Sequence, residues 1–415
     1  MDVHEVLLST CENNKPSAIN LWDYKTTNSL FQYRNGGPIG RHMIAQLKND
    51  YLIGAHPEEP KLYLWQLNSH DPSKNIRLIL PEVATCLSVC PHGLYLAVGI
   101  KTNLYIWHLP SGKLLTIQKK NVQKITVVKF SACGSLVIVG SEDGSLSTYK
   151  LVHLVSLHKN DLSHREVGQT EPLYSRSDHN GAILDIQIGS FALRTKVATC
   201  SLDQTVKIYK LSTGTLIHNI ITEHPVYSFI ADCMFHNGYI GCSNGVLLTF
   251  TIPTSNNYHL TSEEIETKNL SLEGHTKTVK CLSLNQKGDI LASGGDDGTI
   301  MLWNTISKKH VSFIKLNSPI TNLRFTVNHQ NIWSQNFDVT TAVVDLEMTF
   351  NLSNTNFKIM VLNNAPIGSV KRKWESVKEK EEIEKLEKEN TNLRATNQQM
   401  YKFILDLLKN KDDKK

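Results

Sequence analysis

The chain has 415 residues, of which 40% are hydrophobic and 20% are charged; this composition is typical of a folded protein and excludes disorder over most of the length. The formal net charge of +5 is too small to predict nucleic-acid binding by itself. No stretch approaches the roughly 18 consecutive apolar residues of a membrane helix, and the first residues lack the basic start and apolar run of a secretory signal. We therefore expect no membrane insertion and no secretion.

The eight cysteines are scattered along the chain, and most of them fall in apolar, strand-like runs. No group of cysteines and histidines has the spacing of a zinc site. We expect buried thiols in a reducing, intracellular compartment, with no metal and no cofactor.

A repeat recurs through the first 350 residues. Its clearest copy, residues 274–304, reads as three short strands separated by the turn-forming stretches 286–288 and 296–298. The last strand of each copy carries an aromatic residue, and these residues are spaced by 43, 42, 42, 60, 41 and 53 positions: Trp22, Trp65, Trp107, Tyr149, Tyr209, Phe250 and Trp303. The two wide spacings place insertions at about 153–178 and 253–270.

This period of about 40–45 residues, with apolar residues alternating every second position, is typical of the WD repeat, a four-stranded propeller blade. A helical-repeat array would have a helical periodicity instead. We predict an all-β fold, a WD-repeat β-propeller over residues 1–350.

The number of blades depends on the two ends of the propeller. The N-terminal unit lacks its first strand, and a degenerate eighth unit follows at 320–346. If the two ends share one blade, the ring has seven blades, which is our prediction; a ring of eight blades stays open. Residues 351–370 are expected to form a linker, in which 357–363 is a further strand candidate for the closure.

One copy of the repeat contains a serine, a histidine and an aspartate, the residue types of a hydrolase triad. The set comprises His275, Ser293, Asp297 and Trp303, and a second copy comprises His179, Thr199, Asp203 and Tyr209. An active site has no reason to occur twice with its nucleophile changed, and no G-x-S-x-G elbow surrounds Ser293. We predict that both sets are structural hydrogen-bond networks within blades, and we predict no catalytic residue.

The composition changes to helix-forming residues over 371–410. A heptad pattern places apolar or asparagine residues along one seam: Ile383, Leu386, Asn390, Leu393, Asn397, Met400, Ile404 and Leu407. This pattern predicts a coiled-coil helix, and asparagines at two a positions favour a defined register and a low oligomer number. The helix either forms a homodimer or binds a partner protein, and residues 411–415 are expected to be a disordered tail.

The chain resembles the WD repeat-containing protein 18 family, the WD-repeat subunit of the Rix complex. The resemblance rests on residues 31–37, 86–100, 197–216 and 274–304, together with the final charged heptads. Three residues depart from the repeat pattern, because Glu59, Lys101 and Asn244 stand where the turn aspartate would be; this affects the expected blade boundaries.

The resemblance implies a non-catalytic scaffold of the nucleus, nucleolus and nucleoplasm that takes part in maturing pre-60S ribosomal particles and processing spacer rRNA. The implied partners are a helical-repeat scaffold and other Rix-complex subunits, the pre-60S particle and an AAA-type remodelling ATPase. The sequence leaves direct RNA contact open. It also leaves open an alternative function, a substrate-receptor or peptide-reading propeller in another complex such as a ubiquitin ligase, which a basic cluster at the channel mouth would favour.

Overall fold

The computed structural model divides the chain into two compact units, Met1–Asn351 and Leu352–Lys415. The structure describes these residues: 5–12, 19–76, 78–119, 121–155, 170–190, 195–252, 258–260, 271–272, 274–328, 330–333 and 341–348. The strand candidate 357–363, the predicted coiled coil 371–410 and the expected tail 411–415 lie outside the described residues.

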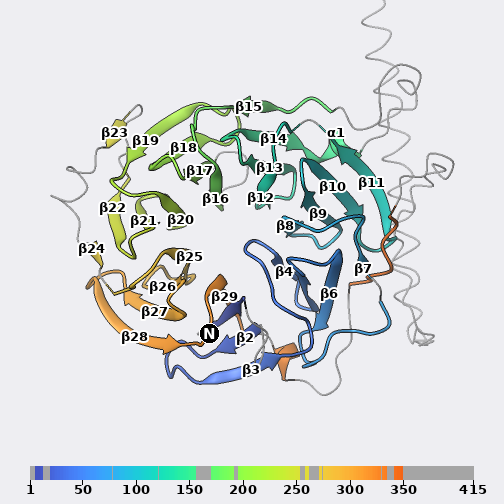
Figure 1. The fold of residues 1–415 in the computed structure, drawn as a ribbon, viewed down its shortest axis with the longest axis horizontal. Coiled ribbons are helices and arrows are strands. Elements are labelled where there is room, and N and C mark those ends of the chain that lie inside the picture. Colours follow the sequence, from blue (N-terminus) through green and yellow to red (C-terminus); the bar gives the residue numbers. More distant parts are fainter. Residues whose placement is uncertain are drawn as a thin grey trace, which may run out of the picture. The chain divides into compact units, whose positions relative to one another are not determined.

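Seven sheets stand side by side in a ring, and their strands are antiparallel except for β23, which is parallel to β19 (Figure 1). We number them blades 1 to 7 and give their strands from the innermost outwards. Blade 1 holds β29 (Ile320–Val327), β1 (Glu5–Cys11), β2 (Ile19–Trp22) and β3 (Ser29–Tyr33), and blade 2 holds β4 (Ile44–Leu47), β5 (Tyr51–Ala55), β6 (Lys61–Gln66) and β7 (Leu78–Ile79). Blade 3 holds β8 (Cys86–Val89), β9 (Tyr95–Ile100), β10 (Asn103–His108) and β11 (Lys113–Gln118), and blade 4 holds β12 (Ile125–Phe130), β13 (Leu136–Ser141), β14 (Leu146–Lys150) and β15 (Tyr174–Arg176). Blade 5 holds β16 (Ile183–Ile188), β17 (Lys196–Ser201), β18 (Thr205–Lys210), β19 (Leu216–Ile221) and β23 (Tyr258–Leu260). Blade 6 holds β20 (Val226–Ala231), β21 (Asn237–Cys242), β22 (Leu247–Thr251) and β24 (Ser271–Leu272), and blade 7 holds β25 (Val279–Leu284), β26 (Ile290–Gly295), β27 (Thr299–Asn304) and β28 (Lys309–Lys315).

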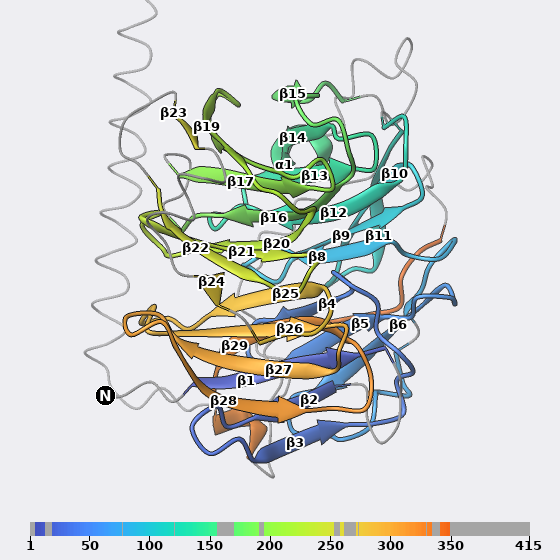
Figure 2. The same cartoon turned by 60° about the vertical axis from the view of Figure 1, so that its left-hand side comes forward.

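Burial along the strands follows their place in the ring. In β25 buried and partly exposed residues alternate, as expected for an innermost strand with one side towards the central channel. The second strand, such as β13, is buried at every position because neighbouring blades cover both its faces. The core therefore lies between adjacent blades. Figure 2 shows how the blades follow one another in an oblique view.

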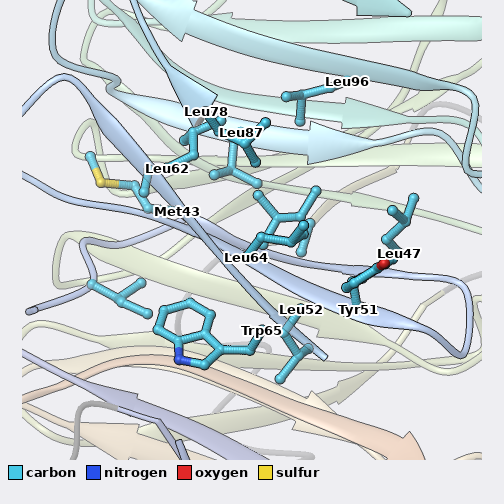
Figure 3. Packing of buried hydrophobic residues seen from close by; sticks show 14 of the residues in the cluster. Met43, Leu47, Tyr51, Leu52, Leu62, Leu64, Trp65, Leu78, Leu87 and Leu96 are labelled. Atoms are coloured by element: carbon cyan, nitrogen blue, oxygen red, sulfur yellow. The ribbon is translucent and has the colours of Figure 1, made fainter. Parts of the chain in front are cut away.

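The contact between blades 2 and 3 illustrates this core. Leucines from β5, β6 and β7 pack against Leu87 of β8 and Leu96 of β9, with Trp65 at the end of the cluster (Figure 3). Trp65 is 1% exposed and Leu96 is fully buried. Burying such side chains contributes roughly 1.5–3 kcal/mol each, so blade-to-blade packing is the main stabilising contribution.

The first blade combines both ends of the propeller, and the prediction of seven blades is confirmed. Strand β29 pairs antiparallel with β1, with Leu8 opposite Arg324. The described residues of the eighth unit form no blade of their own and contribute β29 to blade 1. After β29 the chain makes a short 3-10 turn, η2 (Gln330–Ile332), and residues 341–348 then lie along blades 2 and 3.

The insertions extend blades 4 and 5. After β14 the chain forms the helix α1 (Leu151–Val155), and β23 from the second insertion adds to blade 5 in parallel with β19. No helix in the described part of the chain is long and apolar enough to cross a membrane. All eight cysteines are free, and six of them are buried.

Candidate interaction surfaces

The residues predicted as a network in blade 7 meet in the structure. The Nδ1 atom of His275 lies 3.0 Å from Oδ2 of Asp297, and its Nε2 atom lies 2.8 Å from Oγ of Ser293. Trp303 donates its indole N–H to the same Oγ at 2.9 Å. The chain of bonds joins β26, β27 and the segment before β25 to the turn at 296–298, so it holds their register.

The carboxylate of Asp297 is fully occupied inside this network. Besides the imidazole it accepts the backbone N–H groups of Thr276 and Thr299, each at 3.0 Å, and the hydroxyl of Thr299 at 2.7 Å. These bonds lower the pKa of Asp297 although burial opposes them. The turn also needs its glycine, because Gly298 has φ +74° and a Cβ there would lie 2.6 Å from the carbonyl oxygen of Leu316.

The order of atoms from serine to histidine to aspartate is that of a hydrolase triad, but a substrate has no access to the serine hydroxyl. Ser293 is 0% exposed and the side chain of His275 is 0% exposed. The hydroxyl of Ser293 also accepts the Trp303 N–H, so no substrate atom reaches it. Burial is the largest influence on His275 and lowers its pKa, which favours the neutral ring.

Blade 5 repeats the arrangement with changed side chains. The Nδ1 atom of His179 lies 2.9 Å from Oδ2 of Asp203, and its Nε2 atom lies 2.7 Å from Oγ1 of Thr199. Thr205 donates to Asp203 through both its N–H and its hydroxyl. Burial raises the pKa of Tyr209, which replaces the tryptophan beside Thr199.

In blades without the full network, the indole N–H of the tryptophan donates to other acceptors. Trp22 donates to Oγ of Ser9 at 2.8 Å, and Trp65 donates to the carbonyl oxygen of Arg34 at 3.1 Å. In blade 6, Asn244 accepts the N–H of Val246, the bond that the turn aspartate makes elsewhere. In blade 3, Lys101 occupies the turn with φ 51°.

Sequence reasoning missed a segment that crosses the central channel. Residues 38–43, which we call the channel segment, precede β4, and in Figure 1 this blue chain reaches towards the middle of the ring. The backbone N–H of His42 donates to Oδ1 of Asn322 in blade 1 at 2.7 Å, while its carbonyl oxygen accepts the N–H of Leu87 in blade 3 at 2.8 Å. Asn322 also donates to the carbonyl oxygen of Gly40 at 2.7 Å.

The side chains of the channel segment reach the far side of the ring. Arg41 donates to the carbonyl oxygen of Tyr227 in blade 6, and Nε2 of His42 lies 2.9 Å from the carbonyl oxygen of Leu184 in blade 5. Together with its own blade, the segment therefore joins five of the seven blades. Its sequence carries no motif that predicts this, because a loop before a strand has the same composition wherever it lies.

The cations on the innermost strands do not form a cluster. Lys129 pairs with Asp185 at 3.0 Å and Lys280 pairs with Asp296 at 2.6 Å. Of the three cations on these strands, only Arg324 is exposed without a partner among the described residues. The basic cluster that a peptide-reading channel would need is therefore not assembled on the innermost strands.

Residues 341–348, which we call the strap, are a second connection that the sequence did not reveal. The N–H of Thr341 donates to Asp50 in blade 2 at 2.7 Å, and the N–H of Glu347 donates to the carbonyl oxygen of Gly112 in blade 3 at 2.8 Å. Trp107 of blade 3 donates its indole N–H to the carbonyl oxygen of Glu347 at 2.8 Å. The strap thus supplies the acceptor that blade 3 itself lacks.

The family profile described as "WD domain, G-beta repeat" matches residues 112–150 and 266–304. Each match spans the outermost strand of one blade and the three inner strands of the next. The chain is built of WD repeats. Its sequence repeat and its structural blade are offset by one strand.

Curated relatives extend the similarity of this WD-repeat protein along the chain. It is 28% identical over 319 residues to "WD repeat-containing protein 18" of Danio rerio, covering 77% of this chain and 72% of the relative. It is 26% identical over 390 residues to "Pre-rRNA-processing protein crb3/ipi3" of Schizosaccharomyces pombe, covering 86% and 85%. The resemblance to the WD repeat-containing protein 18 family is confirmed.

A solved structure supports the fold alone. The crystal structure of the computationally designed Ika8 protein matches the WD-repeat chain with a TM-score of 0.54 and 18% identity, over 78% of this chain and 88% of that one. No group of three or more His, Cys, Asp or Glu side chains that could hold a metal ion occurs within the described residues. The predicted seam residues 383–407 lie outside them.

Proposed function

We propose that this chain is a non-catalytic scaffold subunit of a nuclear Rix-type complex that matures pre-60S ribosomal particles. The similarity to the pre-rRNA-processing protein crb3/ipi3 over 86% of the chain is the observation that carries the proposal. On this proposal the protein works in the nucleus, nucleolus and nucleoplasm and takes part in spacer rRNA processing.

The geometry supports a scaffold rather than an enzyme. Both arrangements that have the hydroxyl, histidine and aspartate in the order of a triad are buried, and their aspartates are used within the blades. The channel segment ties opposite blades together, which favours a rigid ring. A rigid ring of this kind presents several separate surfaces at fixed distances, so it suits the docking of several partners at once.

We further propose that residues 371–410 form a coiled-coil helix that gives a second contact, either with a second copy or with a partner. Two linked contacts raise the avidity well above that of either one. The proposed partners are the helical-repeat scaffold and other subunits of the complex, the pre-60S particle and its AAA-type remodelling ATPase.

The decisive experiment depletes the protein and measures ribosomal subunits on sucrose gradients. We expect large subunits to fall, small subunits to be spared and spacer rRNA to accumulate. An unchanged ratio of the two subunits with normal spacer processing would overturn the proposal and favour a substrate receptor in another complex.

A variant tests the coiled coil within the same assay. Leu386→Glu with Leu393→Glu breaks the seam, and should abolish co-purification of the complex while the propeller stays folded. Lys388→Glu with Ala395→Glu is the matched control, because it adds two glutamates at f positions away from the seam. If both double variants assemble equally well, the seam is not the second contact.

A further inference from the structure

The outermost strand of blade 7 is the longest outermost strand of the propeller that other segments leave open. Strand β28 has seven residues and lies on the rim of the ring (Figures 1 and 2). Within the described residues, no strand pairs with its outer edge. An open edge presents unpaired backbone N–H and C=O groups, which bind another strand readily.

The other long outermost strands are contacted from outside their blades. His70 covers β3, because its ring stacks on Phe31 with centroids 4.1 Å apart and its Nδ1 atom lies 2.6 Å from the carbonyl oxygen of Gln32. The helix α1 packs against β11. In blade 5, β23 pairs with β19. Strand β28 is thus the exception.

Strand β28 also exposes apolar side chains, whereas a protected edge strand would expose charged ones. Phe313 is 59% exposed and Val311 is 55% exposed, and Ile306 in the preceding turn is 85% exposed. Phe313 stands opposite Met301 of β27, and β24, the outermost strand of the neighbouring blade 6, has only two residues. Contiguous exposed apolar side chains at a sheet edge are typical of an interaction surface.

The segment that carries these apolar side chains has charged side chains of one sign. Residues 305–315 contain Lys308, Lys309, His310 and Lys315 and no acidic residue. The side-chain ammonium groups of the three lysines have no hydrogen-bond or ion-pair partner among the described residues. The surface is therefore complementary to a ligand that carries both acidic and apolar side chains.

A groove leads up to the start of this strand. It has a volume of about 660 Å³, lies where blades 5, 6 and 7 meet, and includes Ile306 and Lys308 in its lining. Two acidic residues also line it, but they are engaged in their own turns: Asp232 accepts the N–H groups of His236 and Asn237, and Asp289 accepts the side-chain amide of Asn285.

We propose that an extended acidic segment of a partner protein lies in this groove and adds to the edge of β28 as an additional strand. Its backbone pairs with β28, its apolar side chains cover Val311 and Phe313, and its carboxylates meet the lysines. This mode of binding obtains affinity from main-chain hydrogen bonds and specificity from alternate side chains. The inference does not depend on the proposed role in ribosome maturation.

The test uses the full-length protein and a fluorescein-labelled peptide in which glutamate alternates with valine and phenylalanine. Fluorescence anisotropy should show binding that weakens as salt is raised. The same peptide with lysine in place of glutamate should not bind. If the acidic peptide fails to bind, or both peptides bind equally, the proposal is overturned.

Variants locate the site. Lys308→Glu with Lys309→Glu should raise the Kd about tenfold, since two attractions become repulsions. The edge stays charged in this variant, with the sign reversed at both positions, so aggregation is avoided. Lys308→Arg with Lys309→Arg should bind as the natural chain does. The matched control, Lys113→Glu with Lys210→Glu, makes the same charge change on blades 3 and 5 and should leave the Kd within about twofold.

Phe313→Ser tests the apolar part and should raise the Kd about fivefold, whereas Val152→Ser on α1, where the side chain is 69% exposed, should not change it. All these side chains are partly or largely exposed, so melting temperatures should stay the same. An unchanged Kd for the Lys308→Glu, Lys309→Glu variant would overturn the proposal. The proposal would also be overturned if a labelled oligouridine bound through these lysines while the acidic peptide did not bind. That result would assign the surface to RNA.

Discussion

Arg41 donates a hydrogen bond from Nη2 to the carbonyl oxygen of Tyr227, 186 residues further along the chain. The two residues belong to blades 2 and 6, so the bond crosses the channel instead of joining neighbouring blades. Most of the packing in the ring is between adjacent blades, and this bond limits how far blades 2 and 6 can move apart.

The channel segment is therefore expected to stabilise the ring. Arg41→Met should lower the free energy of unfolding by about 1–2 kcal/mol in urea, because it removes a hydrogen bond from a charged donor and leaves the Tyr227 carbonyl oxygen to the weak thiol donor of Cys200, 3.4 Å away. Lys101→Met is the control: its ion pair with Glu82 is exposed, at 73% and 48%, and should contribute under about 1 kcal/mol. Equal stability of the two variants would show that the segment only fills space.

The blade 7 network should contribute more stability than an isolated turn aspartate. Asp297→Ala leaves His275 and two backbone N–H groups without their acceptor and should cost about 1–3 kcal/mol. Asp143→Ala in blade 4 removes an aspartate that accepts the N–H of Ser145 and has no histidine partner, so its cost should be smaller. Thermal melts of the two variants compare these costs, and a larger loss for Asp143→Ala would contradict the structural role of the network.

His42 should make stability depend on pH in a defined window. Burial lowers the pKa of His42 from 6.5 to about 4, and Arg41 and Lys129 act in the same direction while Asp185 opposes them. The unfolded chain therefore takes up a proton at higher pH than the folded chain. The contribution of neutral His42 is complete above pH 6.5 and is lost progressively down to pH 4, by at most about 1.4 kcal/mol per pH unit.

The variant His42→Gln removes this titration. Its stability should fall less steeply than that of the natural chain between pH 6.5 and 4, measured by urea unfolding at each pH. Parallel curves for the two proteins would mean that His42 is protonated equally readily in the folded and unfolded states.

The strap offers a matched pair of positions. Leu346 is 8% exposed in the core of blades 2 and 3, so Leu346→Ala should cost about 2–4 kcal/mol. Val344, two residues earlier, is 40% exposed, and Val344→Ala should cost well under about 1 kcal/mol. Unfolding in urea measures both. If the two substitutions cost the same, the strap is not packed as the structure has it.

Local signals in the chain were enough to predict the propeller. The spacing of Trp22, Trp65 and Trp107 and the turn at 296–298 identify the repeated blade. Each blade packs against its neighbours in the same way and therefore needs similar residues at the same positions. The missing first strand and the extra unit at 320–346 were sufficient to predict seven blades, since an incomplete blade must find a strand elsewhere in the chain. The grouping of His275, Ser293, Asp297 and Trp303 also followed from their positions in one repeat.

Contacts without a repeat were decided only by the tertiary structure. Nothing in residues 38–43 indicates that Arg41 and His42 reach blades 6 and 5, because the distance between these blades is set by the closed ring and not by local sequence. The same holds for the strap, whose last residues satisfy Trp107 although the repeat pattern predicts another strand there. The open edge of β28 is likewise decided by which segments pair with each outermost strand: β23 pairs with β19, and no described strand pairs with the outer edge of β28. Residues that recur with the repeat predict the blade, because the blade occurs seven times in the fold. Contacts that occur only once depend on how the ring closes, so the repeat does not predict them.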